Sequence, residues 1–368
     1  MKNTWYLPPI GSPKFSIPTP ALLIDRAAME SNLECMADFF RHRSAKLRPH
    51  FKTHKSPQLA LLQIEMGAIG MTCAKLSEAE VLAEAGVENI LIANQVVDLR
   101  KMIRLAELAR GTQIIVAVDQ ETNLHQIAEA AHEAGSIVGI VIEVDVGMGR
   151  CGVPPGEACL PLARLAAQLP GVHFAGLLGY EGHTVFEIDP HRRQENAFQA
   201  MTKLTGTADL LRSHGLEVEI VSAGGTGTAF LSGDFPGVTE IEAGSYPFMD
   251  VKYNQLGLPF RQALTLQATV ISTPSPQRAI IDAGMKALTT DNGLPVVAGL
   301  PGVKLLRLSE EHGLLEVDPE QARFQPGDRI EIIPSHVCTT VNLHDRYIVM
   351  QDEKVQEIWT ISGRGRFY

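Results

Sequence analysis

Several features that mark particular protein classes are scarce in this sequence of 368 residues. It has only five cysteines, an odd number that favours free thiols or a metal ligand over a disulfide framework. Its formal net charge of -10 gives no reason to expect nucleic acid or an anionic membrane as a partner, because both would repel such a surface. Pro8 and Pro9 interrupt the start of the chain and no long apolar run follows, so we expect neither a signal peptide nor a membrane span. We therefore expect a cytoplasmic protein that binds small molecules.

Short apolar runs alternate with segments of helical periodicity over most of the chain. The eight runs are Leu47–Lys52, Gly70–Lys75, Asn89–Asn94, Gln113–Asp119, Ile137–Asp145, His173–Tyr180, Val218–Ala223 and Val238–Ala243. Repeated βα units predict an α/β fold with a parallel sheet, and eight of them favour a closed (β/α)8 TIM-like barrel. A doubly wound open sheet would give similar local patterns and is the alternative.

After about residue 255 the pattern changes to alternating β-type segments between proline and glycine turns. These segments are Ala263–Ser272, Val303–Leu308, Gly313–Val317, Arg329–Ile333, Tyr347–Gln351 and Glu357–Ile361. They predict a second, mainly antiparallel β domain. We place the barrel at residues 18–254 and the β domain at residues 1–17 plus 255–368. Since prolines precede the strand predicted at Ala21–Asp25, the amino-terminal arm is expected to begin outside the barrel and to join the β domain.

Polar side chains end several of the eight runs, and in a parallel barrel these positions meet at the face where reactive groups collect. Lys52 ends the first run. Burial lowers the pKa of a lysine and suits it to imine chemistry with an aldehyde cofactor. The alternative is a structural lysine paired with a carboxylate at the barrel rim.

Two loops after the last runs have the composition of a phosphate-binding site. The segment Ser222–Thr228 contains three glycines, and consecutive glycines let backbone N–H groups approach a phosphate. Gly244-Ser245-Tyr246 follows the eighth run, and barrels often bind phosphate between their last loops. Either loop alone could be an ordinary turn, but together they predict a phosphorylated cofactor.

A third segment, Pro334-Ser335-His336-Val337-Cys338, has the composition of a metal site. In an extended strand, alternate residues place the His336 imidazole and the Cys338 thiolate on the same face. The alternative is a buried cysteine beside a hydrogen-bonded histidine. A soft sulfur ligand would favour zinc over manganese or magnesium.

These segments, in this order, resemble the D-threonine aldolase and D-serine dehydratase group of fold-type III pyridoxal-phosphate enzymes, which are relatives of alanine racemase. The resemblance spans almost the whole chain and rests on Thr19–Asp25, Arg48–Lys55, Glu143–Val153, Gly224–Thr226 and His336–Asp345. It implies an alanine racemase-like barrel plus a β domain, with pyridoxal 5'-phosphate and a divalent metal as cofactors. It also implies a homodimer that acts on a small D-amino acid.

The resemblance assigns roles to individual residues. Lys52 matches the lysine that carries the cofactor as a Schiff base, and it is preferred over Lys55 because it follows Pro-His-Xaa. Tyr180 and His183 are its expected catalytic partners. The residues expected to contact the cofactor are Lys52, His50, Arg150, Tyr180, Gly224, Gly225, Thr226, Gly244, Ser245 and Tyr246. The expected metal ligands are His336 and Cys338.

The same resemblance leaves two reactions open. The sequence around His336 and through Thr340–Asp345 favours a D-threonine aldolase-like retro-aldol cleavage of a D-3-hydroxy amino acid to glycine and an aldehyde. Two departures favour the alternative, a D-serine dehydratase-like ammonia-lyase: Cys338 replaces the aspartate more common in aldolases, and Phe186 stands where aldolases carry a histidine base. His183 is then the nearest substitute base. A racemase or a non-catalytic pyridoxal-phosphate-binding protein is less favoured, since the latter needs no β domain.

Overall fold

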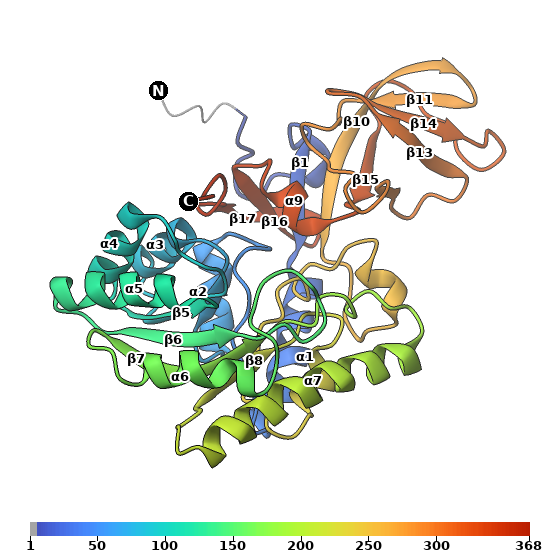
Figure 1. Cartoon of the computed structure of the whole chain (residues 1–368). Coiled ribbons are helices and arrows are strands. Elements are labelled where there is room, and N and C mark those ends of the chain that lie inside the picture. Colours follow the sequence, from blue (N-terminus) through green and yellow to red (C-terminus); the bar gives the residue numbers. More distant parts are fainter. Residues whose placement is uncertain (1–5) are drawn as a thin grey trace. The chain divides into compact units, whose positions relative to one another are not determined.

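The structure is a computed structural model that describes residues 6–368. The chain forms two compact units, which Figure 1 shows in sequence colours. The barrel unit comprises Glu34–Lys52, Pro57–Gly244 and Gly365–Tyr368, and the β unit comprises the residues up to Leu33, Thr53–Ser56 and Ser245–Arg364. Neither unit is therefore one continuous stretch of sequence.

The barrel unit is built on an 8-stranded parallel sheet with the order β2-β9-β8-β7-β6-β5-β4-β3. Its strands are β2 (Lys46–Leu47), β3 (Met71–Cys73), β4 (Asn89–Ile92), β5 (Gln113–Val118), β6 (Val138–Glu143), β7 (Val172–Gly179), β8 (Ile220–Ala223) and β9 (Glu240–Ile241). A parallel bridge between His50 and Thr72 joins the segment after β2 to β3, and the Phe51 N–H donates to the Thr72 carbonyl at 2.7 Å. Because β2 and β3 stand at the two ends of the strand order, this bridge closes the sheet. The prediction of a (β/α)8 barrel is confirmed.

A helix follows each strand from β2 to β8 in the chain. These helices are α2 (Pro57–Glu65), α3 (Leu76–Glu84), α4 (Leu99–Leu108), α5 (Glu121–Ala134), α6 (Leu160–Ala166), α7 (Pro190–Ser213) and α8 (Ala229–Gly233). Figure 1 labels α2 to α7 among these helices. Local sequence sets their ends: the Asp98 side chain accepts from the Lys101 N–H at the start of α4, and Gly135 ends α5 with a φ of 65°. In β5 every residue after Gln113 is buried, as expected for a strand whose two faces are both covered.

The β unit contains a mainly antiparallel sheet with the order β13-β14-β11-β10-β1-β16-β17, to which β15 and β12 add beside β10. Its strands are β1 (Ala21–Asp25), β10 (Leu264–Ser275), β11 (Arg278–Ile281), β12 (Val296–Val297), β13 (Val303–Leu308), β14 (Gly313–Val317), β15 (Arg329–Ile333), β16 (Arg346–Gln351) and β17 (Lys354–Thr360). The short helices of this unit are η1 (Lys14–Ser16), η3 (Tyr253–Leu256) and α9 (Val337–Val341). The remaining helices are η2 (Glu157–Cys159) in the barrel unit and α1 (Arg26–Arg41), which begins in the β unit and ends in the barrel unit.

Strand β1 falls inside the range 18–254 predicted for the barrel, but it pairs within the sheet of the β unit. It is antiparallel to β10 and parallel to β16, so both of its edges are hydrogen-bonded there. Its central residues Leu22, Leu23 and Ile24 are almost fully buried. An apolar strand with two paired edges has no reason to leave this sheet for the barrel.

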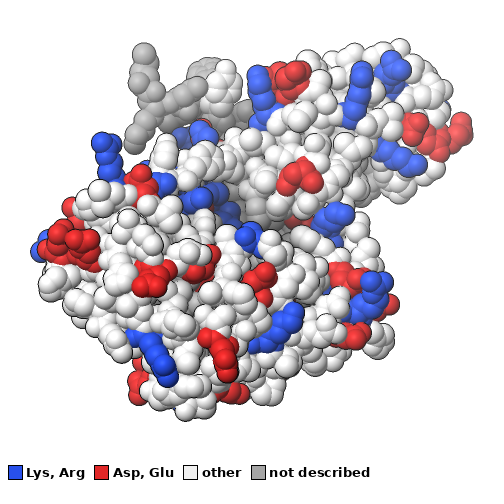
Figure 2. All heavy atoms as spheres, viewed as in Figure 1, with Lys and Arg blue, Asp and Glu red and all other residues white. Residues whose placement is uncertain are grey.

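Charged side chains of both signs are distributed over the surface. On the face drawn in Figure 2, lysines and arginines are interspersed with aspartates and glutamates. The acidic excess of the chain is therefore not gathered into one patch on that face. None of the helices in residues 6–368 is both long and apolar enough to cross a membrane.

A buried ion pair lies inside the barrel unit, between the segment after β2 and the neighbouring strand β9. The Arg48 guanidinium donates two hydrogen bonds to the Glu240 carboxylate, each 2.9 Å long, and both side chains are only 3% exposed. Arg48 also donates to Asn89 Oδ1 at 2.5 Å. Arg48 follows β2, Glu240 begins β9 and Asn89 begins β4, so this one arginine connects three barrel strands.

We expect Glu240→Ala to lower the free energy of unfolding by about 3–5 kcal/mol, because it leaves the Arg48 charge buried without its carboxylate. Urea denaturation measures this loss. The control is Asp209→Ala, which breaks the exposed pair with Arg212 and should cost about 0.5 kcal/mol or less. Equal losses in the two variants would show that the buried pair does not stabilise the barrel.

Candidate active site

Three strand-end segments of the barrel unit bring a lysine, a tyrosine and an arginine together. Lys52 Nζ lies 5.6 Å from the centroid of the Tyr180 ring, and Arg150 Cζ lies 5.8 Å from the same centroid. Lys52 follows the bridge residue His50, whose Nδ1 accepts from the Lys52 N–H at 3.3 Å. Tyr180 follows β7 and Arg150 lies in the loop after β6, so the cluster is at the carboxyl-terminal end of the barrel strands.

Arg150 is oriented by a glutamate at the end of β6. Its Nη2 lies 3.7 Å from Glu143 Oε1, and the Gln95 side-chain amide donates to Glu143 Oε2 at 2.5 Å. Burial raises the pKa of Glu143, while Gln95 and Arg150 act in the opposite direction. Glu143 therefore serves as the acceptor that links the loops after β4 and β6.

His183 is exposed and lies against the loop that carries Arg150. A side chain at Gly147 would come within 3.1 Å of the His183 ring. The Asp145 carboxylate accepts from the N–H groups of Gly147 and Gly149 at 3.0 Å each, and these bonds lower its pKa. The imidazole therefore packs on an ordered turn. Phe186, which lies with His183 on the loop between β7 and α7, is 39% exposed.

The glycine-rich loop after β8 uses two of its amides internally. The Gly224 N–H donates to Glu181 Oε2 at 3.0 Å, and the Gly225 N–H donates to Thr228 Oγ1 at 3.2 Å. Gly227 is buried, and within residues 6–368 its N–H has no hydrogen-bond acceptor. A buried amide without an acceptor is uncommon, so it indicates a place for an anionic group such as phosphate.

Glu242 is a buried carboxyl group near Lys52, and it directly follows β9. It accepts a hydrogen bond of 2.7 Å from Ser222 Oγ on the neighbouring strand β8. Burial raises its pKa to about 7, although the Ser222 hydrogen bond and the charges of Lys52 and Arg48 act to lower it. It therefore exchanges a proton in the physiological pH range.

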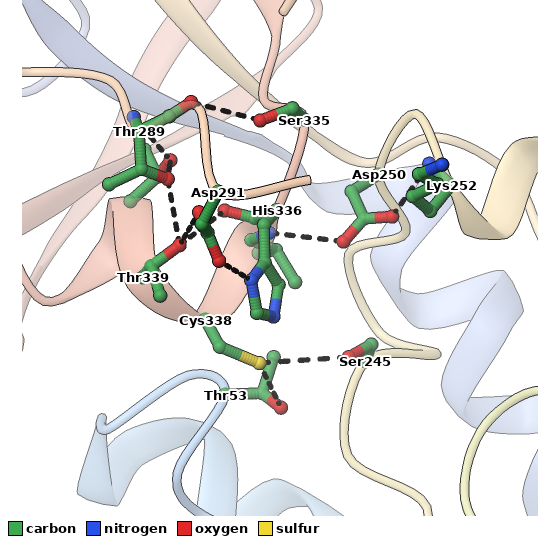
Figure 3. A network of polar contacts seen from close by, with 12 residues as sticks. Thr53, Ser245, Asp250, Lys252, Thr289, Asp291, Ser335, His336, Cys338 and Thr339 are labelled. Atoms are coloured by element: carbon green, nitrogen blue, oxygen red, sulfur yellow. Dashed lines mark hydrogen bonds and ion pairs between the residues drawn. The ribbon is translucent and has the colours of Figure 1, made fainter. Parts of the chain in front are cut away.

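In the β unit, His336 and Cys338 lie together in a network of polar contacts (Figure 3). The expected extended strand over Pro334–Cys338 is wrong: His336 is the N-cap of α9, and Cys338 lies in its first turn. The reason is a tertiary contact, because the buried carboxylate of Asp250 accepts from the Val337 N–H at 3.0 Å and so satisfies the start of a helix. The two side chains still meet, since His336 forms a side-chain hydrogen bond with Cys338.

His336 also has a carboxylate partner. Its Nδ1 lies 2.5 Å from Asp291 Oδ2, and the Thr339 hydroxyl donates to Asp291 Oδ1 at 2.8 Å. Burial works to lower the pKa of His336, but hydrogen bonds and charge from Cys338 and Asp291 outweigh it and raise the pKa to about 9. The contact of Nδ1 with Asp291 leaves Nε2 as the ring nitrogen on the side of Cys338 (Figure 3).

Cys338 contacts two hydroxyl groups of the same unit. Its Sγ lies 3.2 Å from Thr53 Oγ1 and 3.9 Å from Ser245 Oγ. In residues 6–368, no group of three or more histidine, cysteine, aspartate or glutamate side chains could hold a metal ion. His336 and Cys338 are thus a two-donor site, and a metal bound there would complete its coordination with water or substrate.

Comparison with known proteins identifies the family of the chain. The family model of the alanine racemase N-terminal domain matches residues 24–251, and that of a putative serine dehydratase domain matches residues 263–350. A D-threonine aldolase from Arthrobacter sp. is 41% identical, with 96% of this chain and 95% of the relative covered. The chain belongs to the D-threonine aldolase and D-serine dehydratase-like family. Aldolases and dehydratases are lyases, so this is a family of lyases.

Other members of the family are also similar over their full length. A 3-hydroxy-D-aspartate aldolase from Paracoccus denitrificans is 34% identical, with 97% of this chain and 95% of the relative covered. A D-threo-3-hydroxyaspartate dehydratase from Delftia sp. is 31% identical, with 94% of this chain and 97% of the relative covered. The crystal structure of the D-threonine aldolase from Filomicrobium marinum has a TM-score of 0.95 and 39% identity, with 98% of this chain and 100% of that chain covered.

The residues predicted from the family resemblance fall into two groups. Those in the barrel unit are Lys52, His50, Arg150, Tyr180, His183, Gly224, Gly225, Thr226 and Gly244, and those in the β unit are Ser245, Tyr246, His336 and Cys338. Tyr246 is buried, and its ring centroid lies 5.8 Å from that of Phe260. The chain changes unit at five peptide bonds, and two of them, Lys52–Thr53 and Gly244–Ser245, fall at predicted site residues.

Sequence reasoning did not single out Glu181, Glu242, Asp291 or Gly227 as site residues of this lyase. Glu181 directly follows Tyr180, and Gly227 lies within the glycine-rich segment, so both could have been found by examining the neighbours of known motifs. For Glu242, the sequence indicates only a polar residue within an apolar run. Asp291 lies in a loop with no pattern, so only the fold brings it to His336.

We expect the stability of the cofactor-free protein to fall as pH rises from about 5 to about 7, in part because of Glu242. Its pKa is raised from an ordinary 4.5 to about 7 in the folded state, so between these values the folded chain binds a proton that the unfolded chain releases. The urea concentration at the unfolding midpoint of Glu242→Gln should equal that of the wild type near pH 5 and exceed it at pH 8. The exposed Glu217→Gln is the matched control and should keep the wild-type profile. Parallel profiles of Glu242→Gln and the wild type would contradict the assignment.

Proposed function

We propose that this chain is a pyridoxal-phosphate- and divalent-metal-dependent lyase, which cleaves a D-3-hydroxy amino acid to glycine and an aldehyde. The observation that carries the proposal is the position of Lys52 beside the Tyr180 ring and Arg150 in the barrel unit. D-threonine aldolase and 3-hydroxy-D-aspartate aldolase are among the relatives of this chain, which supports an aldol cleavage. The cytoplasmic location and the homodimer stay predictions.

The residues of the barrel unit fit pyridoxal 5'-phosphate. Lys52 would hold the aldehyde covalently, Tyr180 and Arg150 would contact the ring, and the buried N–H of Gly227 would donate to the phosphate. His50, Gly224, Gly225, Thr226 and Gly244 of the same unit complete this part of the proposed cofactor site, and Ser245 and Tyr246 of the β unit stay predictions from the family resemblance. When bound, the cofactor supplies a ring that accepts electrons from the α-carbon of the substrate.

The donor chemistry of His336 and Cys338 fits a divalent metal. An imidazole and a thiolate together favour zinc, with manganese and magnesium as alternatives. Asp291 would orient the imidazole through Nδ1 so that Nε2 is directed at the metal. When bound, the metal supplies a Lewis acid for the hydroxyl group of the substrate.

The chain must also move the hydroxyl proton for a Cα–Cβ bond to break. We assign this role to His183, because an imidazole accepts protons and this one lies exposed on the loop after β7, beside the turn that carries Arg150. Phe186, on the same loop, has no group that could do so. Removal of this proton releases the aldehyde, and a proton delivered to the α-carbon yields glycine.

A D-serine dehydratase-like elimination is the second candidate, and Cys338 favours it because its thiolate replaces the carboxylate more common in aldolases. In that reaction Lys52 would remove the α-proton and the hydroxyl group would leave as water. Hydrolysis of the resulting unsaturated amine would then give a keto acid and ammonia. The two reactions differ in the bond that breaks, so their products distinguish them.

The direct test is product analysis after incubation with pyridoxal 5'-phosphate, a divalent metal and D-threonine, D-serine or D-3-hydroxyaspartate. We expect glycine and acetaldehyde from D-threonine. A keto acid and ammonia would instead establish the dehydratase reaction, and no turnover of the whole panel would refute a lyase. Lys52→Ala should lower turnover by about three orders of magnitude or more and remove the visible absorbance of the bound cofactor. Lys75→Ala, at an exposed lysine of the next strand end, should change neither.

Removal of the metal tests the second cofactor. We expect exhaustive chelation to abolish turnover and to leave the visible absorbance of the cofactor in place, because different residues are assigned to the two groups. Asp291→Asn should weaken metal affinity about 10- to 100-fold, measured by competition with a coloured chelator. Asp352→Asn, an equal change in an exposed turn of the same unit, is the control. Full activity after chelation, or unchanged metal affinity of Asp291→Asn, would refute these roles.

A further inference from the structure

Glu181 is a fully buried carboxyl group that follows Tyr180 in the barrel unit, and neither the family resemblance nor the proposed mechanism gives it a role. Its Oε1 accepts from the hydroxyl groups of Thr228 at 2.7 Å and Ser232 at 2.6 Å. Its Oε2 accepts from the Gly224 N–H at 3.0 Å. All three donors are neutral and belong to the glycine-rich loop or to α8, which follows it. One side chain of the Tyr180 loop therefore bonds to both ends of the loop after β8.

These bonds determine which amides of the glycine-rich loop remain for a ligand. The Gly224 N–H is taken by Glu181, and the Gly225 N–H is taken by Thr228, whose hydroxyl in turn donates to Glu181. The buried Gly227 N–H has no acceptor within the part of the chain that the structure describes. Glu181 thus holds the Gly224 amide directly and the Gly225 amide through Thr228, and it leaves the Gly227 amide for a ligand.

The two loops also touch at backbone distance, so one cannot shift without the other. A side chain at Gly227 would come within 1.9 Å of the Val185 carbonyl oxygen, and one at Gly225 within 3.2 Å of the Tyr180 ring. The approach at Gly227 is open only to glycine, and the one at Gly225 is tight. Since Glu181 stands between Tyr180 and Val185 in sequence, its hydrogen bonds fix this contact from inside.

We propose that Glu181 is a positioning residue that sets the glycine-rich loop for the phosphate group of the cofactor and keeps it in register with the Tyr180 ring. The proposal rests on the proposed function, because it takes pyridoxal 5'-phosphate as the ligand. Glu181 should affect the binding of the phosphate group and not that of the aldehyde. It acts on the loop that would bind the phosphate, whereas the aldehyde is assigned to Lys52. Loss of Glu181 should therefore weaken the binding of a phosphorylated ligand and leave the binding of one without phosphate unchanged.

The test compares the dissociation constants of pyridoxal 5'-phosphate and of pyridoxal, which lacks the phosphate, by titration of the cofactor-free protein. Glu181→Met has a side chain of similar length without acceptors, so it leaves three buried donors unsatisfied. We expect this variant to raise the dissociation constant of pyridoxal 5'-phosphate about 10-fold or more and to change that of pyridoxal by about twofold or less. Glu181→Gln should restore most of the affinity, because its oxygen can accept from Gly224 while its amide donates to the two hydroxyl groups, which can also accept.

Two further variants control the result. Thr228→Val is isosteric and removes the hydroxyl shared by Glu181 and Gly225, so it should reproduce the phosphate-selective loss if Glu181→Met does not fold. Glu187 lies in the same loop, and its carboxylate contacts Arg192. Glu187→Met should therefore change the affinity for neither pyridoxal 5'-phosphate nor pyridoxal. Equal weakening of both aldehydes, or unchanged binding of pyridoxal 5'-phosphate, overturns the role of Glu181. Failure of the wild-type protein to bind pyridoxal 5'-phosphate would instead overturn the proposed function itself.

Discussion

Closure of the parallel sheet between the segment after β2 and strand β3 is the constraint on which the candidate site of the barrel unit depends. The bridge between His50 and Thr72 makes this closure, and Lys52 follows two residues later. In an open sheet, the first and last strands of the order would stand at opposite edges, far from one another. In the closed sheet, residues after β2, β6 and β7 share one rim, so Lys52, Arg150 and Tyr180 meet although they are distant in sequence.

Buried carboxyl groups hold the loops of both units by accepting hydrogen bonds. Glu181 accepts from an amide and two hydroxyl groups, and Glu242 accepts from Ser222. In the β unit, Asp250 accepts from the N–H groups of Val337, Lys252 and Tyr253 at 3.0 Å each. A buried polar group is costly unless it is paired, so each of these acids fixes the conformation of the loop that satisfies it.

The sequence predicted the barrel, the β domain and the family, because hydrophobic periodicity and short motifs are local properties of the chain. It predicted a strand over Pro334–Cys338, where the structure has the start of α9, since the decisive cap comes from Asp250, far away in sequence. For the same reason it could not assign Asp291 to His336 or Glu181 to Gly224, which are contacts made by the tertiary fold. Lys55, over which Lys52 is preferred, is buried and donates to the Gly363 carbonyl at 3.3 Å, a contact that the sequence does not indicate.

The position of β1 in the middle of its sheet has a consequence for how the chain is made on the ribosome. Its two hydrogen-bonding partners, β10 and β16, are translated much later than β1. All strands of the barrel leave the ribosome before either partner, and domains generally fold as their residues emerge. Strand β1 is therefore among the last strands of this fold to find its place, and its apolar residues must stay clear of other chains until β10 and β16 have been synthesised.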